Sequence, residues 1–571
     1  MNDQRSSQTD PMDGCDARMS AVPRPRTLRA GLLLILIGSY LFFLPFALWP
    51  FLEPKLLLLN LGAILVWWSG LPLTRRPGLS AGIFAGVLVL AALTGVAPLD
   101  SLLGVRFAST GLALLLPCLF LVAAVPALPE DVLERVPAWL TGLGAVVSAV
   151  MLVALLLPGL LRVWPALHWD LTRNALGSTV GHPLFAIALL AVALAAALDR
   201  HVRRRRVSAL VMLGVVALGL ALPHEASSFV LAAVVVACWL WRARPERAVA
   251  LQGIGVVVLA FVLSFVVVAL PNSTGTGATD TAQVGDVAQA QFTPALQTPV
   301  QRAPSPASSR LAAWRVGLRA WADRPLLGWG TDMGLTAYLA NVTPQEAARQ
   351  APERAWWDVH NIFIQFLLTT GVVGLLALLF LIVQTMPWAL TAPPDLAWAS
   401  AGVVALGFWS LYEPINVAVL PVLAVVLGAA SRPRGLSRRE PNPRILRGAV
   451  GVVLAACTVL IALALVQGVV FLSSVKRESV PGLRAAAAMV PWRTESKWYI
   501  ARFGDPAAGN TMMADLVRSR PWDPEVRLSA AWVAELSGRR DLAERYLMEQ
   551  LEVFPGDGLG VEEVLQGNWP P

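Results

Sequence analysis

Long uncharged apolar runs alternate with short polar segments over most of the chain, and two longer polar segments interrupt this rhythm. A bilayer core of about 30 Å needs roughly 20 apolar residues per helix, and about thirteen runs approach that length. They predict membrane helices over 28–48, 55–73, 79–97, 108–128, 137–160, 181–198, 206–222, 226–242, 248–270, 361–386, 395–412, 414–430 and 448–473. The pattern therefore predicts an all-α, polytopic transmembrane bundle.

The two interruptions define the expected domain organisation. We expect a cytoplasmic tail, nine membrane helices, a large outer loop, four more membrane helices and a helical outer tail. These parts correspond to residues 1–27, 28–270, 271–359, 360–473 and 474–571.

The composition supports a membrane protein, because the 571 residues are 56% hydrophobic and only 14% charged, unlike soluble globular domains. The polar N-terminus does not fit a signal peptide, so the first apolar run is interpreted as an uncleaved helix. The four cysteines, Cys15, Cys118, Cys238 and Cys457, fall in separate segments. They indicate neither a metal site nor a disulfide framework.

The placement of Lys and Arg predicts the orientation. With the N-terminus inside, roughly 22 basic residues fall on the cytoplasmic side and about 4 in the short outer loops, as the positive-inside rule requires. An odd number of helices then places the C-terminus outside. The net charge of +8 is therefore a topology signal. Short arginine loops without interleaved aromatics do not indicate nucleic-acid binding.

The outer loop divides into two halves. Residues 272–309 are rich in Gly, Ser, Thr, Pro, Ala and Gln, a composition that predicts flexibility. In the second half, Leu311, Trp314, Leu318 and Trp321 recur at helical spacing. They predict a helix over 310–324 that lies along the membrane surface or caps a cavity.

Two further signals follow in the loop. Pro325 and the turn Gly328-Trp329-Gly330 end the first helix. A second short helix is expected after Thr343, because Thr343 and Glu346 have the spacing of a capping box and Pro344 suits the first helical position.

The outer tail contains two predicted amphipathic helices around Gly538. Ala531, Gly538, Ala543 and Pro555 have the relative spacings of a tetratricopeptide repeat. Residues 483–501 are a candidate for a degenerate partner repeat. The tail is interpreted either as a helical cap on the membrane domain or as a module that binds a protein partner.

Four of the five histidines, His168, His182, His224 and His360, are predicted at the outer surface. Histidine can accept a proton near neutral pH, which helps a weakly acidic hydroxyl to attack. Arginine complements it, since a guanidinium holds phosphate oxygens bidentately. Acceptor activation beside a phosphate site is thus the chemistry that these residues favour.

The main constellation runs from Arg310 to Gly374. It comprises Ser309-Arg310-Leu311-Ala312-Ala313-Trp314-Arg315, then Pro325 with Gly328 and Gly330, then His360-Asn361 at the start of a helix, with Gly371 and Gly374 below. This succession resembles the domain of O-antigen ligases and polymerases over roughly residues 165–430, most closely in 309–374.

The resemblance implies a metal-independent inverting glycosyltransferase with no cofactor. Such an enzyme takes a glycan from an undecaprenyl-diphosphate carrier at the outer face of the bacterial inner membrane. The acceptor would be a polysaccharide or lipid A-core, and the pathway lipopolysaccharide or exopolysaccharide biosynthesis. His360 would be the base, Asn361 its orienting partner, and Arg310 and Arg315 the diphosphate ligands.

Other polar residues are secondary candidates. Arg173 and His182 lie in the segment that resembles the family's approach to its middle helix, and Arg173 would be another phosphate contact. His224-Glu225 stands where many ligases have a Ser-Arg pair, and would act as an acid/base pair. Glu413 is an acid at membrane depth, which makes it a site candidate by default.

Alternative functions remain open from the sequence. A lipid-linked oligosaccharide transporter or flippase would carry charges in mid-helix and an internal hydropathy repeat, and neither is evident. A protein O-oligosaccharyltransferase would share the same motif. A scaffold, or a peptidoglycan polymerase of the shape and division family, would leave the His360-Asn361 motif unexplained.

Overall fold

The computed structural model describes residues 24–44, 51–104, 111–157, 175–180, 182–273, 306–348, 358–413, 416–432 and 444–567. Regular structure in these ranges consists of helices, without strands. Arg173, His168 and most of the segment predicted to be flexible lie outside the described residues.

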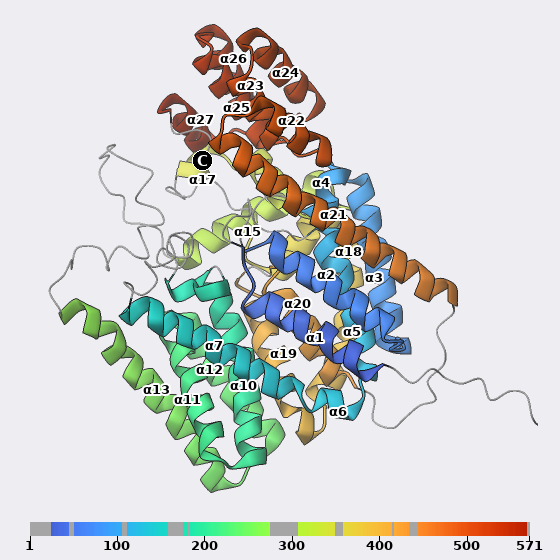
Figure 1. Cartoon of the computed structure of the whole chain (residues 1–571), viewed down its shortest axis with the longest axis vertical. Helices are drawn as coiled ribbons and strands as arrows, with labels where there is room; N and C mark the ends of the chain where they lie inside the picture. Colours follow the sequence, from blue (N-terminus) through green and yellow to red (C-terminus); the bar gives the residue numbers. More distant parts are fainter. Residues whose placement is uncertain are drawn as a thin grey trace, which may run out of the picture.

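The membrane bundle contains long apolar helices joined by short connections (Figure 1). Its first part has α1 (Pro25–Tyr40), α2 (Glu53–Trp68), α3 (Arg75–Thr94), α4 (Pro98–Leu103), α5 (Leu112–Ala124), η1 (Val125–Ala127), α6 (Glu130–Leu133) and α7 (Val136–Leu156). The second part has η2 (Ala175–Val180), α10 (Pro183–Arg204), α11 (Val207–Ala221), α12 (Ala226–Ala243), α13 (Arg247–Ser273), α18 (Ile362–Leu390), η3 (Pro394–Leu396), α19 (Ala397–Trp409), α20 (Val419–Ala430) and α21 (Arg444–Lys476).

Every span predicted from the sequence overlaps one of these helices. Within the described ranges, seven helical segments are long and apolar enough to cross a membrane: Arg75–Thr94, Glu130–Leu156, Pro183–Arg204, Ala226–Ala243, Arg247–Val268, Ile362–Leu390 and Arg447–Lys476. The all-helical membrane architecture is therefore confirmed, while the count of about thirteen spans stays a prediction.

The central helix of the bundle is α10, which contacts α7, α11, α12 and α19. Small side chains let these helices approach closely: a Cβ at Gly144 on α7 would lie 2.4 Å from the Cβ of Ala193 on α10. Close packing of small residues is the usual means of helix association in membranes, where burial from water contributes little. This central helix carries His182 immediately before its first turn and Arg204 at its last residue.

The outer loop folds as α15 (Pro306–Asp323), α16 (Gly334–Asn341) and α17 (Pro344–Ala348). The helix predicted over 310–324 is confirmed as α15. The capping box is also present, since the backbone N–H of Glu346 donates to Oγ1 of Thr343 at 3.3 Å and that of Thr343 to the Glu346 carboxylate at 3.0 Å.

The buried side of α15 is not the stripe of large residues. Ala313, Val316 and Ala320 are fully buried, whereas Leu311 and Leu318 are 51% and 44% exposed. The face with small side chains is the buried one, because it allows α15 to pack tightly on α18 and α16. Leu311 and Leu318 are left exposed, as a helix at a membrane surface would present them, whereas Trp314 of the same stripe is partly buried.

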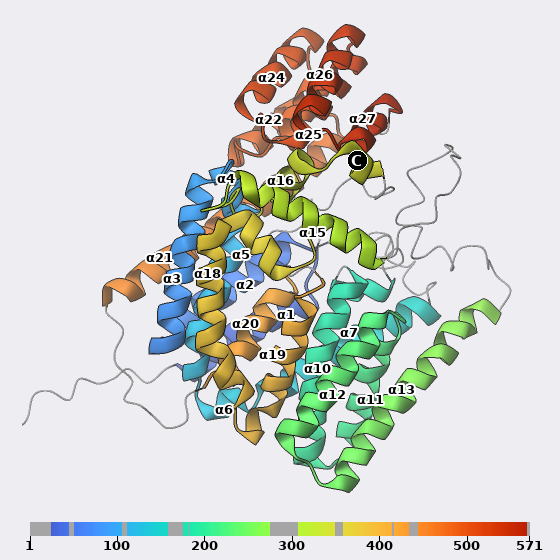
Figure 2. The same cartoon turned by 180° about the vertical axis from the view of Figure 1, so that it is seen from behind.

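The tail forms six helices stacked on the end of the bundle that carries α15 (Figures 1 and 2). They are α22 (Val480–Met489), α23 (Glu495–Phe503), α24 (Pro506–Ser519), α25 (Pro524–Leu536), α26 (Arg540–Val553) and α27 (Gly558–Leu565). The two helices expected around Gly538 are present, and Gly538 takes φ +71° between them. Their relation to tetratricopeptide repeats remains a prediction.

Buried ion pairs attach this tail to the membrane helices. Nη1 of Arg493 lies 2.6 Å from the Glu53 carboxylate on α2, whose side chain is 3% exposed. Arg520 pairs with Asp100 on α4. Phe554, after α26, packs in one buried cluster with Tyr338 and Val342 of the outer loop. The tail therefore covers the loop and contacts the bundle at several points.

Candidate functional site

A buried carboxylate joins the histidine and the arginine of the main motif. Nδ1 of His360 lies 3.2 Å from Oε2 of Glu413, and Arg310 forms an ion pair with Oε1 of the same side chain. Glu413 is 3% exposed, against 22% for His360 and 26% for Arg310. Its charge is thus held between two partners, as a buried carboxylate requires.

The three groups come from three elements. Arg310 lies in the first part of α15 and His360 immediately before α18, while Glu413 lies in the turn that follows α19. The backbone N–H of Glu413 donates to the carbonyl of Trp409 at 3.0 Å, which continues the helical pattern into that turn. The site therefore forms where α15 meets the start of α18 and the end of α19.

Asn361 fixes the start of α18. Its Oδ1 accepts from the backbone N–H groups of Phe363 and Ile364 at 3.0 and 3.2 Å, and its Nδ2 donates to the carbonyl of Leu411 at 3.0 Å. Capping of this kind stabilises a helix by about 1 kcal/mol. Asn361 thereby ties the His360 segment to the turn that carries Glu413.

His360 itself has a constrained backbone. It takes φ +53°, which is uncommon outside glycine. Its backbone N–H donates to Oδ1 of Asp358 at 2.6 Å. This local hydrogen bond supports a conformation that directs the ring toward Glu413.

The turn at Gly328 packs into an interruption of α18. Gly371 breaks that helix with φ +65° and ψ −171°, and a Cβ there would lie 2.2 Å from backbone atoms of Leu326. Two backbone hydrogen bonds join this turn to α18. The N–H of Gly330 donates to the carbonyl of Thr369 at 2.9 Å, and the N–H of Val372 donates to the carbonyl of Pro325 at 2.8 Å. Glycine is thus needed at these positions, because the two backbones approach too closely for a Cβ. This contact fixes the end of α15 relative to α18.

A small cavity lies beside the histidine. Its polar lining includes Thr331, Asp332, Asp358, Gln365 and Glu413. Burial raises the pKa of Asp358 to about 6, although the nearby His360 ring acts in the opposite direction. The sequence interpretation missed Asp332 and Asp358, even though Asp358 stands only two residues before the histidine motif.

His182 lies within electrostatic range of this site. It precedes α10, where its Nδ1 accepts from the backbone N–H of Leu184 at 3.2 Å. Loss of hydration lowers the pKa of His182, whereas the Glu413 carboxylate raises it and the His360 ring lowers it. The structure therefore brings His182 near the central group of residues.

Other candidates are placed elsewhere. Arg315 is exposed on α15, because five residues of helix turn it well away from the direction of Arg310. Nε2 of His224 lies 3.0 Å from Oγ of Ser264 on α13, and its ring packs against Phe265. Glu225 is exposed. Arg173 lies outside the described residues.

Comparison with known families gives a match in the middle of the chain. Residues 225–379 match the sequence model of a family described as O-Antigen ligase. The matched segment contains Arg310, the Gly328 turn and His360, and it ends before Glu413. The search of curated proteins found no match to the chain.

Proposed function

We propose that this chain, whose residues 225–379 match the O-Antigen ligase family model, is an enzyme of the O-antigen ligase and polymerase family. It would transfer a glycan from a lipid diphosphate to a hydroxyl acceptor at the His360–Glu413–Arg310 group. Undecaprenyl diphosphate is the proposed carrier, and a polysaccharide or lipid A-core the proposed acceptor. The observation that carries the proposal is the buried Glu413 carboxylate between the imidazole and the guanidinium.

His360 acts as the general base in this proposal. Nδ1 faces Glu413, and Nε2 is the nitrogen proposed to accept the proton of the acceptor hydroxyl. The Glu413 carboxylate favours the tautomer that is protonated at Nδ1 and stabilises the imidazolium that forms. A positioned base of this kind contributes about 10²–10⁴ in rate.

The bonds that form and break define the role of Arg310. The acceptor oxygen bonds to the anomeric carbon as its proton passes to His360, and the bond from that carbon to the diphosphate oxygen breaks. The electron pair leaves with the diphosphate. A guanidinium has five N–H donors, so Arg310 can hold Glu413 and still donate to the phosphate oxygens. Attack from the face opposite the leaving group inverts the anomeric centre.

The location of the site supports a lipid-linked donor. His360 and Glu413 lie at the ends of membrane helices, and Arg310 lies on α15, whose side chains Leu311 and Leu318 are exposed. A carrier lipid in the bilayer could place its diphosphate at this level while a polar glycan extends toward the outer loop. By the positive-inside pattern this end of the bundle is periplasmic.

The direct test uses the full chain in lipid nanodiscs with a glycan linked to undecaprenyl diphosphate. Release of the lipid diphosphate together with a lengthened or transferred glycan would support the proposal, and donor consumption without glycan transfer would overturn it. Deletion of the gene separates two acceptor classes on a polysaccharide gel. Loss of all attached chains indicates a ligase, whereas chains of a single repeat unit indicate a polymerase.

A further inference from the structure

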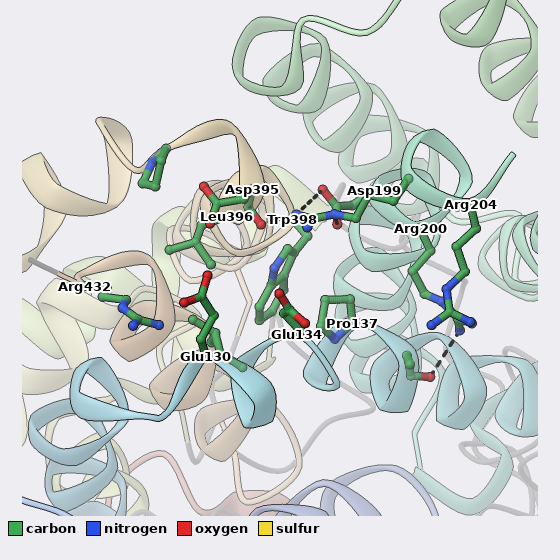
Figure 3. A pocket seen from close by; sticks show the side chains of 14 residues that line it. Glu130, Glu134, Pro137, Asp199, Arg200, Arg204, Asp395, Leu396, Trp398 and Arg432 are labelled. Atoms are coloured by element: carbon green, nitrogen blue, oxygen red, sulfur yellow. Dashed lines mark hydrogen bonds and ion pairs between the residues drawn. The ribbon is translucent and has the colours of Figure 1, made fainter. Parts of the chain in front are cut away.

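A well-defined cavity lies at the opposite end of the bundle from His360. It has a volume of about 470 Å³, which is within the usual range of small-molecule sites. Its walls come from the α6–α7 turn, the last turn of α10, η3 with the start of α19, and Arg432 after α20 (Figure 3). Because α10, α18 and α19 each span from one end to the other, this cavity is remote from the proposed glycan transfer.

Both signs of charge face this cavity. Its carboxylates are Glu130, Glu134, Asp199 and Asp395, and its guanidinium groups are those of Arg200, Arg203, Arg204 and Arg432. Figure 3 shows Glu130 and Glu134 between Arg432 on one side and Arg200 with Arg204 on the other. The cavity therefore has an acidic centre with basic flanks.

Two of these charged groups, Arg203 and Asp199, already form an ion pair with each other. Nε of Arg203 lies 2.7 Å from Oδ2 of Asp199, whose side chain is 4% exposed. For the part of the chain that the structure describes, no ion pair links Glu130, Glu134, Arg204 or Arg432 to another residue. These groups remain able to meet a ligand that carries a cation and an anion.

The floor of the cavity is apolar. Leu133, Leu396 and the fully buried Trp398 line it beside the charged groups. Such a combination at the end of membrane helices fits the boundary between lipid headgroups and acyl chains. Basic pockets between membrane helices on the cytoplasmic side commonly bind lipid headgroups.

The carboxylates of the cavity determine which class of lipid headgroup it can bind. A purely anionic headgroup would meet the carboxylates of Glu130, Glu134 and Asp395, and like charges at close range repel. An ammonium group is their complement, because it donates up to three hydrogen bonds. A phosphate one ethylene unit away would then reach a flanking guanidinium.

We propose that this cavity binds the headgroup of an aminophospholipid, with the ammonium between Glu130 and Glu134 and the phosphate at Arg200 and Arg204. A phosphatidylethanolamine of the bilayer is the ligand. This site is separate from the glycan transfer site, and neither proposal depends on the other.

The test is native mass spectrometry of the full chain with phosphatidylethanolamine, phosphatidylcholine and phosphatidylglycerol of matched acyl chains. Retention of phosphatidylethanolamine should exceed that of the other two by about fivefold, because charge-assisted hydrogen bonds need its N–H groups. Equal retention of the three lipids, or preference for phosphatidylglycerol, would overturn the proposal. Free O-phosphoethanolamine that binds as tightly as the lipid would reject the lipid assignment.

Substitutions in the cavity test whether the lipid binds there. The double change Glu130→Gln with Glu134→Gln should abolish the preference over phosphatidylcholine, and Arg200→Gln with Arg204→Gln should weaken retention of phosphatidylethanolamine by about fivefold. Arg206→Gln is the matched control, since Arg206 is exposed and does not line the cavity. Unchanged lipid preference in both double variants, at normal melting temperature, would place the lipid elsewhere and reject this site.

Discussion

Nδ1 of His360 lies 3.2 Å from Oε2 of Glu413, although 53 residues separate the two along the chain. The same carboxylate holds Arg310, which is 103 residues away from it in sequence. A single acid therefore positions both groups that the proposed transfer reaction needs, and each can be tested separately.

Replacement of His360 removes the proposed base. His360→Gln should lower the rate of glycan transfer by at least about 100-fold, with much less effect on donor binding. The rate is measured with purified protein in nanodiscs. His224→Gln is the matched control, because His224 hydrogen-bonds to Ser264 and should be replaceable with little loss of rate. Comparable losses in both variants would contradict the assignment of the base.

Glu413→Gln tests the positioning role of the carboxylate. It keeps the shape of the side chain and removes its charge, so the imidazolium of His360 loses its stabilising partner. The rate should fall by about 10–100-fold, and the acid limb of the pH–rate profile should move to lower pH. A fall in rate with an unchanged profile would indicate a structural role only.

Arg310→Lys keeps a positive charge but removes the guanidinium fork. We expect KM for the lipid diphosphate donor to rise by about tenfold or more, since a lysine cannot bind two phosphate oxygens in the same geometry. Arg315→Lys on the same helix is the comparison, and its exposed position predicts a change below about threefold. A larger effect at Arg315 would shift the diphosphate site to the other side of α15.

The pKa of Asp358, raised by burial to about 6, predicts a dependence of stability on pH. The folded protein holds this proton more tightly than the unfolded chain, so stability is greatest below about pH 4 and falls as pH rises toward 6. Asp358→Asn keeps an oxygen that can accept the hydrogen bond from the backbone N–H of His360 and removes the carboxyl group that titrates. Relative to the parent, it should gain roughly 2–3 kcal/mol between pH 4 and 7. Parallel melting curves for the two proteins across this range would contradict the burial of Asp358.

The ion pair between Arg493 and Glu53 predicts a strong effect on stability. Arg493→Ala leaves a buried carboxylate without its partner, which costs about 3 kcal/mol. Thermal unfolding in detergent measures this loss, and adding Glu53→Gln should restore part of it. Arg484→Ala, at an exposed position of α22, should leave the melting temperature within about 1 °C of the parent.

The sequence predicted the helical elements well, because a 20-residue apolar run in a membrane protein has few alternatives to a helix. It also selected Arg310 and His360, whose motif is local in the chain and whose side chains the structure brings to one carboxylate. The turn at Gly328 was recognised as a turn, but its insertion into α18 at Gly371 was not foreseen. The sequence is apolar on both sides of Gly371, so its hydropathy does not indicate the interruption of the helix.

The face of α15 and the partner of His360 were beyond the sequence. Periodicity placed Leu311 and Leu318 on one stripe but did not indicate which side packs. The structure buries Ala313 and Val316, because tight helix contacts favour small side chains. Glu413 was noted only as an acid at membrane depth. Its link to His360 and Arg310 is a tertiary contact between distant segments, which single-sequence patterns do not encode.

The tail also determines where this chain can be shortened. A protein that ends at Lys476 would retain all the helices of the membrane bundle, yet it would expose Glu53, Asp100 and the apolar side of Val342 to water. A Cβ at Gly556 would lie 2.1 Å from the side chain of Val342, which shows how closely the last residues fit against the loop. Shortened forms for crystallisation or cell-free synthesis should therefore extend through Leu565.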